Sequence, residues 1–237
     1  MSNQTENNVK KPILKHLAII MDGNRRWAKD RGLLPWEGHQ AAMPLVRNMG
    51  QWCLDRGIEY LTFFAFSTEN WKRTQPEVEM LMGLFYTAVT DEVDTYMERN
   101  VRLKIVGGRE GLSQKLIDAI TAAEERTSGN TGGTISLCIN YGGRPEIIEA
   151  TKEAIRRGMK PEDITEESLH ALMWSKDLPD ADLIIRTSGE QRLSGYLTWL
   201  SVYSELLFIE KHWPDFTEAD LDAALAEYQA RQRRFGK

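Results

Sequence analysis

Six short apolar runs, alternating with longer segments of helical periodicity, constrain this chain more than any other feature of its sequence. Short unbroken apolar runs suit strands covered on both faces, and their alternation with helices predicts a largely parallel sheet with helices on both faces. We therefore expect an α/β fold. The predicted strands cover residues 17–21, 60–66, 101–106, 134–139, 182–186 and 206–209.

The segments between these strands carry apolar residues at helical spacing and helix-capping signals. Thr165 and Thr217 each precede carboxylates, which is typical of a helix N-terminus. One predicted helix, residues 77–98, has an apolar face broad enough either to pack in an ordinary core or to wall an apolar cavity. The predicted helices cover residues 40–56, 77–98, 113–127, 145–157, 166–173 and 218–233.

Length and composition indicate one domain. With 237 residues, of which 41% are apolar, the chain can bury a full core and fits one large domain better than two small ones. We expect this domain to cover residues 15–237, after a disordered polar tail at residues 1–14.

Charge and hydropathy exclude several classes of function. The 35 acidic and 30 basic residues give a net charge of −5, so no global basic field recruits nucleic acid. Cys53 and Cys138 lack metal-ligand or disulfide spacing, which predicts buried free thiols in a reducing compartment. We find no signal-peptide pattern and no transmembrane segment, and expect a soluble cytoplasmic protein.

Polar side chains follow the first predicted strand without a spacer. Asp22, Gly23 and Asn24 stand at its end, and Arg25 and Arg26 come next. Ligands of open α/β sheets bind outside the carboxyl ends of strands, and a glycine there lets backbone amides approach a ligand. The arginines indicate an anion, with phosphate the natural candidate, and Asp22 indicates a metal or a proton. The alternative is a plain turn in which Asn24 caps the next helix.

Three further predicted strands also end in polar residues, and folding would bring all four ends to one rim. Several arginines on one rim repel one another unless anions bind there, and their forks suit diphosphates, so we expect more than one diphosphate. The residues concerned are His39 after the first strand; Ser67, Glu69, Asn70, Trp71 and Arg73 after the second; Asn140 and Arg144 after the fourth; and Arg186, Arg192 and Ser194 after the fifth.

Five strings carry these residues: HLAIIMDGNRRWA at 16–28, AFSTENWKR at 65–73, INYGGR at 139–144, DLIIRTSGEQR at 182–192 and WPDF at 213–216. Together they resemble the signatures of the cis-prenyltransferases, and most closely those of the undecaprenyl diphosphate synthases. The resemblance covers roughly residues 15–236, with the motifs in matching order and spacing, so it is far more specific than a lone glycine-rich loop.

This resemblance implies a fold, an activity and an assembly. The fold would be a single α/β domain with a central six-stranded, mostly parallel sheet flanked by helices, with an elongated apolar tunnel beside the sheet. The enzyme would be an Mg²⁺-dependent prenyltransferase that condenses isopentenyl diphosphate onto an allylic diphosphate, with farnesyl diphosphate as the usual starter. A long-chain Z-polyprenyl diphosphate, such as undecaprenyl diphosphate, would be the product. Members form homodimers, and release of a lipid product would allow peripheral contact with a membrane.

The resemblance also implies roles for individual residues. Asp22 and Asn70 would be catalytic, and Asp22 and Glu205 would hold Mg²⁺. The proton acceptor stays open among Asp22, Asn24 and the departing diphosphate. The residues expected to bind substrates are Gly23, Asn24, Arg26 and His39 for the allylic diphosphate, with Arg25 and Trp27 from the same string; Ser67, Thr68, Glu69, Asn70, Trp71 and Arg73 in a mobile loop with its hinge at Glu77; and Arg186, Arg192 and Ser194 for isopentenyl diphosphate.

The chain departs from the family pattern at several positions. Pro35 stands where most members have an arginine that contacts the allylic diphosphate, and we hypothesise that Arg25 or Arg31 supplies the missing charge. Gly195 stands where asparagine is usual, and residues 198–202 differ as well. The segment 233–236 resembles an Arg-x-Gly element that reaches across a dimer, or is a solvated basic helix end.

Product length and catalytic competence each leave an alternative. Ala65 matches a tunnel position where small residues accompany long products, which favours a long chain. A short- or medium-chain Z-prenyl diphosphate synthase is the first alternative, and a non-catalytic accessory subunit is the second. The intact motifs around Asp22 and Arg186 argue against the accessory subunit. Nucleotide binding is disfavoured because neither a Walker nor a Rossmann glycine pattern is present.

Overall fold

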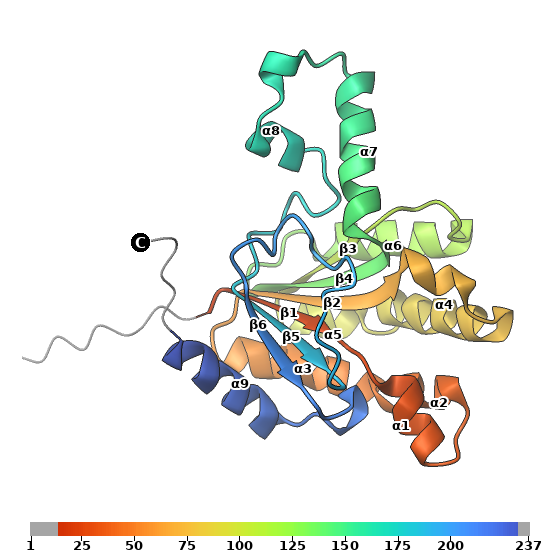
Figure 1. Cartoon of the computed structure of the whole chain (residues 1–237). Helices are drawn as coiled ribbons and strands as arrows, with labels where there is room; N and C mark the ends of the chain where they lie inside the picture. Colours follow the sequence, from red (N-terminus) through yellow and green to blue (C-terminus); the bar gives the residue numbers. More distant parts are fainter. Residues whose placement is uncertain (1–13, 232–237) are drawn as a thin grey trace, which may run out of the picture.

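The structure is a computed structural model, and it describes residues 14–231. Within this range six strands form one sheet in the order β3-β4-β2-β1-β5-β6 (Figure 1). The prediction of an α/β fold is confirmed, and every strand pair is parallel. The strands are β1 (His16–Ile20), β2 (Tyr60–Ser67), β3 (Val101–Val106), β4 (Gly133–Tyr141), β5 (Leu183–Thr187) and β6 (Glu205–Ile209).

Two of the predicted helices are each divided in two. The expected helix 40–56 consists of α2 (Pro35–Ala41) and α3 (Met43–Asp55), because Pro44 cannot continue a helix from upstream. The expected helix 77–98 consists of α4 (Gln75–Thr90) and α5 (Val93–Glu98). At their junction the Thr90 hydroxyl donates to the Tyr86 carbonyl, a contact that often bends helices.

The other predicted helices are present, and one more precedes them. The helix α1 (Asn24–Asp30) directly follows the first strand. Thr165 and Thr217 cap their helices as predicted, by accepting hydrogen bonds from the Ser168 and Asp220 amides. The remaining helices are α6 (Gln114–Thr127), α7 (Gly143–Arg156), α8 (Glu166–His170) and α9 (Glu218–Ala230), with 3₁₀ turns at Thr68–Lys72, Pro161–Asp163 and Trp213–Asp215.

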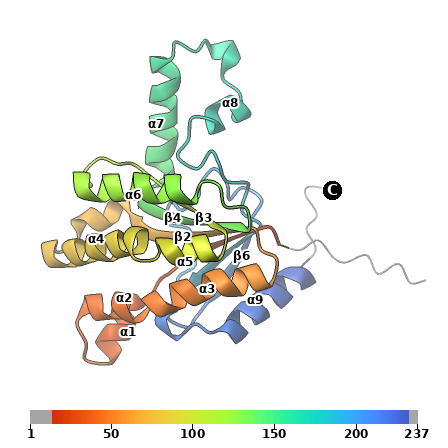
Figure 2. The ribbon, with the colours of Figure 1, turned by 180° about the vertical axis from the view of Figure 1, so that it is seen from behind.

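The two faces of the sheet have different covers. One face packs against α3, α4, α6 and α9, in a core that includes Leu17 and Ile19 of β1 (Figure 2). The alternate residues Ala18 and Ile20 point to the other face, which irregular segments with Tyr196 and Leu200 cover. Helices flank the sheet as predicted, but most of those that pack on it lie on the first face. There α7 projects away from the body, and α8 lies on the segment that returns from it (Figure 1).

Several further expectations can be compared with the described residues. Cys53 and Cys138 are buried and unpaired, as predicted. Leu14, which the sequence placed in the polar tail, is 4% exposed and packs in the larger core. No helix among residues 14–231 is long and apolar enough to cross a membrane. The predicted disordered tail, apart from Leu14, and the Arg-x-Gly element at 233–236 lie outside the described residues.

The contact between α1 and α2 requires a glycine, and this generates a stability prediction. A Cβ on Gly38 would lie 2.0 Å from the Asn24 backbone oxygen, whereas a Cβ on Gly83 in α4 would meet nothing within 4 Å. Gly38→Ala should lower the free energy of unfolding by about 3 kcal/mol because the helices must separate. Gly83→Ala, the matched control, should raise it by about 0.5–1 kcal/mol through helix propensity. Urea unfolding measures both, and equal effects would contradict the packing argument.

Candidate functional site

A cavity of about 750 Å³ opens at the carboxyl end of β1. Residues from the β1–α1 junction, from α1 and from α2 form most of its wall, and Arg73 joins them from the segment after β2. The lining residues that the sequence predicted are Asp22, Gly23, Asn24, Arg25, Arg26, His39 and Arg73. The other lining residues are Met21, Lys29, Gly32, Leu33 and Pro35.

Gly23 fixes the turn between β1 and α1. It has φ +99°, and a Cβ there would lie 2.6 Å from His212 Nδ1 and 2.7 Å from Ser188 Oγ. Only glycine adopts this conformation easily and admits this approach. Gly23 is the N-cap of α1, while Asn24 lies inside the helix and donates its Nδ2 to the Met21 carbonyl at 2.9 Å. The alternative in which Asn24 caps the helix is therefore wrong.

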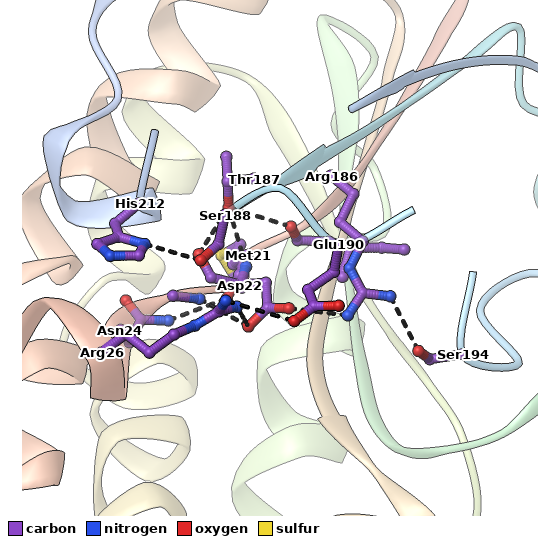
Figure 3. A network of polar contacts seen from close by, with 12 residues as sticks. Met21, Asp22, Asn24, Arg26, Arg186, Thr187, Ser188, Glu190, Ser194 and His212 are labelled. Atoms are coloured by element: carbon purple, nitrogen blue, oxygen red, sulfur yellow. Dashed lines mark hydrogen bonds and ion pairs between the residues drawn. The ribbon is translucent and has the colours of Figure 1, made fainter. Parts of the chain in front are cut away.

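Asp22 and Arg186 form the centre of a polar network at the end of β1 and β5 (Figure 3). Arg186 Nη2 donates to Asp22 Oδ2 at 2.8 Å, and Arg26 Nη2 lies 3.3 Å from Asp22 Oδ1. Burial alone would raise the pKa of Asp22, but the Arg186 hydrogen bond, the Gly23 amide and Arg26 outweigh it and hold that pKa below its usual value. Asp22 is therefore a carboxylate at neutral pH.

Glu190 extends this network into a ring of alternating charges, and the sequence did not single it out. Its carboxylate pairs with Arg26 Nη1 at 3.4 Å and with Arg192 Nη1. Arg186 Nη1 donates to the Arg192 carbonyl and, at 2.9 Å, to Ser194 Oγ, which closes the ring through the β5–β6 loop. Its position between two rim arginines, in the string SGEQR, was the available signal.

A second carboxylate, Glu77 of α4, lies between two other arginines of the rim. Arg73 Nη1 donates to Glu77 Oε1 at 2.9 Å, and Arg25 Nε lies 3.8 Å from the same oxygen. The Glu77 side chain is only 4% exposed, so its pairing with Arg73 compensates a buried charge. These contacts position two guanidinium groups on the wall of the cavity.

Three polar atoms on or beside this wall are buried without a hydrogen-bond partner: Asn24 Oδ1, His39 Nε2 and Arg186 Nε. Buried polar atoms in proteins are nearly always paired, so such atoms indicate a polar ligand. Burial, with the charges of Arg73 and Arg25, lowers the pKa of His39 to about 4. His39 is therefore neutral at pH 7, and its ring can donate one N–H to an anion.

A neighbouring cavity of about 460 Å³ lies between the end of β2, the start of α7 and the loop that carries Ser194. The predicted residues Ser67, Glu69, Asn70 and Ser194 line it, with Arg144 and Gly195. Asn70 Oδ1 accepts from the Ser67 amide at 3.0 Å, so this side chain also shapes the loop. The Thr68 hydroxyl donates to Glu69 at 3.3 Å. Ser194 links this cavity to the network at Asp22 through its hydrogen bond from Arg186.

Two predicted substrate-binding residues, Trp27 and Trp71, make their contacts outside the two cavities. Trp27 donates to Asp215 Oδ1 at 2.7 Å and carries the Arg31 guanidinium over its ring, outside both cavities. Trp71 donates to Asn140 Oδ1 at 2.8 Å and packs edge-on against Phe66.

Glu205 and Asp22 lie at opposite ends of the parallel strands, since Asp22 follows the carboxyl end of β1. Glu205 begins β6 level with Leu183, at the amino end of β5, and pairs with Arg231 at 2.9 Å. One copy of the chain therefore does not bring the two predicted metal carboxylates together. Among residues 14–231 no group of three or more His, Cys, Asp or Glu side chains is arranged to hold a metal.

Comparison with known proteins agrees with this geometry. Residues 20–236 match the family model described as "Putative undecaprenyl diphosphate synthase". The chain is 47% identical over 227 residues to an isoprenyl transferase of Thermotoga maritima, covering 94% of this chain and 97% of that one. It is 45% identical over 225 residues to a decaprenyl diphosphate synthase of Mycobacterium tuberculosis, covering 93% and 76%.

A solved structure has the same fold. The lavandulyl diphosphate synthase of Lavandula x intermedia, in complex with dimethylallyl diphosphate, superimposes with a TM-score of 0.90 at 35% identity, over 95% of this chain and 99% of that one. Together with the rim of arginines around Asp22, these matches show that the chain belongs to the undecaprenyl diphosphate synthase family of isoprenyl transferases.

Proposed function

We propose that this isoprenyl transferase extends farnesyl diphosphate with isopentenyl diphosphate to a long-chain Z-polyprenyl diphosphate, undecaprenyl diphosphate. The observation that carries the proposal is the convergence of guanidinium groups and unpaired buried polar atoms in the cavity at Asp22. Such a site suits a diphosphate, which offers many acceptor oxygens and a high negative charge.

The larger cavity is the proposed site of the allylic diphosphate. Arg25, Arg26 and Arg73 supply positive charge there, and neutral His39 supplies an N–H donor. When the allylic carbon–oxygen bond breaks, its electron pair leaves with the diphosphate. These donors stabilise the negative charge that develops on this leaving group, which lowers the barrier.

The neighbouring cavity and its Ser194 wall suit the diphosphate of isopentenyl diphosphate. The terminal alkene carbon of this substrate forms the new carbon–carbon bond, and a proton leaves the carbon beside the new cation. Asp22 is a weak base because its pKa is lowered and Arg186 occupies one of its oxygens. The departing diphosphate is therefore the better proton acceptor.

Asp22 is the residue that we propose to hold Mg²⁺. Its carboxylate and the unpaired Oδ1 of Asn24 are hard oxygen donors, and Mg²⁺ in proteins is commonly held by one or two carboxylates plus substrate phosphates. The bound ion would neutralise charge on the leaving diphosphate. Glu205 could join this site only from another copy of the chain.

The apolar layer between the sheet and helices α3 to α5 is the proposed space for the growing product. An enclosed cavity of about 40 Å³ lies there, lined by Val46, Leu54, Ala88 and Leu137 among others. This is far smaller than a polyprenyl chain, so the expected tunnel is nearly closed. Flexible side chains such as Met80 and Met82 of α4 pack against the same core and can yield as the product grows.

We also propose that the protein acts as a homodimer in the cytoplasm. Ile148 and Ile155, seven residues apart on the projecting α7, are 54% and 73% exposed. A second copy that covers this helix would remove both side chains from water. The lipid product gives a reason for transient membrane contact during release.

A product assay tests the proposed function. Purified protein is incubated with Mg²⁺, farnesyl diphosphate and labelled isopentenyl diphosphate, and the dephosphorylated products are separated by chromatography. We expect a ladder that ends at undecaprenol. A shorter end point would support the short- or medium-chain alternative, and no incorporation with any allylic starter would support the accessory subunit.

Two arginines near Pro35 are distinguished by the structure. Arg25 lines the cavity, whereas Arg31 pairs with Asp215 at 3.3 Å and stacks over Trp27. Arg25→Ala should therefore raise the KM for the allylic diphosphate about tenfold, the scale of one lost charge-assisted hydrogen bond. Arg31→Ala is the matched control and should change this KM less than about twofold. Steady-state kinetics with varied allylic substrate decide, and equal effects would reject the assignment.

Ala65 provides a test of the product space. It is the extra residue of a bulge where β2 pairs with β4, and its side chain packs against the core beneath α4. Ala65→Leu should shift the product ladder to shorter chains because a larger side chain narrows the layer. Ala65→Gly, which adds no volume, should not shorten the product. An unchanged ladder in the leucine variant would place the growing chain elsewhere.

A further inference from the structure

The carboxylate of Glu190 lies between two arginines of the proposed diphosphate sites, where the anion of a substrate would bind. Through its two oxygens it joins Arg26, at 3.4 Å, to Arg192. Figure 3 shows the side chain of Glu190 next to those of Asp22 and Arg186. No other carboxylate among the described residues pairs with Arg192. Without Glu190, Arg26 would keep only Asp22, and Arg192 would have no carboxylate partner among the described residues.

The two carboxylates of the ring differ in how firmly they are held. Asp22 is fixed by Arg186 at 2.8 Å, by Arg26 and by the Gly23 amide at 2.7 Å. Glu190 has only its two arginines, and its side chain is 35% exposed, while the Arg192 side chain is 59% exposed. Glu190 is therefore the carboxylate that can move out into water at a small cost.

We propose that Glu190 is an internal counter-ion, which holds Arg26 and Arg192 in place before substrate arrives and is then displaced by a substrate diphosphate. This inference rests on the proposed function, because it takes these arginines as diphosphate ligands. A diphosphate carries more charge and more acceptor oxygens than one carboxylate, so it replaces both contacts of Glu190.

The displacement gives Glu190 a part in specificity. Every anion that enters must compete with Glu190, so the carboxylate weakens the binding of all of them. A diphosphate spans both arginines and overcomes this competition, whereas a monophosphate offers fewer oxygens to bridge the same two groups. The cost of moving Glu190 is the same for each anion, so a monophosphate, which gains less from the two arginines, is left with little net binding, whereas a diphosphate still binds.

Titration calorimetry with the full-length chain tests this proposal without turnover. Isopentenyl diphosphate alone, with Mg²⁺, has no allylic partner and does not react. We expect Glu190→Gln to lower the Kd for isopentenyl diphosphate about fivefold, the scale of one exposed ion pair, and to lower the Kd for inorganic phosphate by a similar factor.

Glu210→Gln is the matched control for charge. Glu210 follows β6, and its Oε2 lies 2.5 Å from where a Cβ on Gly189 would stand, next to Glu190. It makes no ion pair with the arginines of the ring. Removal of this charge should change either Kd less than about twofold. If both variants tighten binding equally, the general field of the protein explains the effect and the proposal fails.

The remaining outcomes separate this inference from the proposed function. The proposal is overturned if Glu190→Gln and Glu190→Ala both bind isopentenyl diphosphate no more tightly than the parent while their melting temperatures are unchanged. Glu190 would then only support the structure of the site. Failure of the parent chain to bind isopentenyl diphosphate, or equal binding by Arg192→Ala, would instead overturn the assignment of the diphosphate site and the inference with it. A crystal structure with isopentenyl diphosphate should show Glu190 separated from Arg26.

Discussion

The contact between Asp22 and Arg186 is the interaction on which the rest of the site depends. The two residues stand at the ends of adjacent parallel strands, where Ile20 of β1 is level with Arg186 of β5. Arg186 is 5% exposed, and a buried guanidinium without a carboxylate partner would be costly. The pair therefore joins the β1–α1 turn to the β5–β6 loop and sets the shape of both.

Other contacts of the site extend from this pair. Thr187 Oγ1 donates to the Asp22 carbonyl at 2.7 Å and accepts from the Asp22 amide at 3.0 Å, so main chain and side chain of Asp22 are both held by β5. The Ser188 hydroxyl and the His212 ring are hydrogen-bonded at 2.7 Å, and both lie so close to Gly23 that no side chain fits there. Residues 186–188 and His212 thus determine where α1 begins, and α1 determines where its arginines point.

The sequence predicted much of the fold because parallel strands and their buried apolar runs have a strong local signal. It also predicted which strand ends carry the chemistry, since Asp22, His39 and Arg73 do line one cavity. It could not predict that α7 leaves the sheet, because the irregular cover with Tyr196 has no periodicity to read. The misplacement of Trp27 has the same origin, since the direction of a side chain on α1 depends on long-range contacts with Asp215.

Glu190 and Glu205 show a different limit of sequence reasoning. Glu190 lies in a predicted motif, yet its role depends on which arginines the fold brings to it, and Arg26 is far away in the chain. Glu205 was assigned by resemblance alone, and the register of β6 on β5 places it at the far edge of one copy. A resemblance between sequences can suggest which residues have a role. It does not give the distances between those residues, which depend on the fold and on the assembly of copies.

The unequal covering of the sheet has a mechanical consequence. On one face aromatic rings interlock, with Phe64 stacked on Tyr196 at 4.7 Å and Tyr141 edge-on to both, so this side resists deformation. On the other face ring contacts such as Phe66–Phe85 occur too, but the layer around the cavity of about 40 Å³ consists mainly of aliphatic and thioether side chains, which slide more easily. The sheet is therefore more rigid than the helices that cover its first face. When the apolar layer expands, helices α3 to α5 must move outward, while the strands that hold Asp22 stay in place.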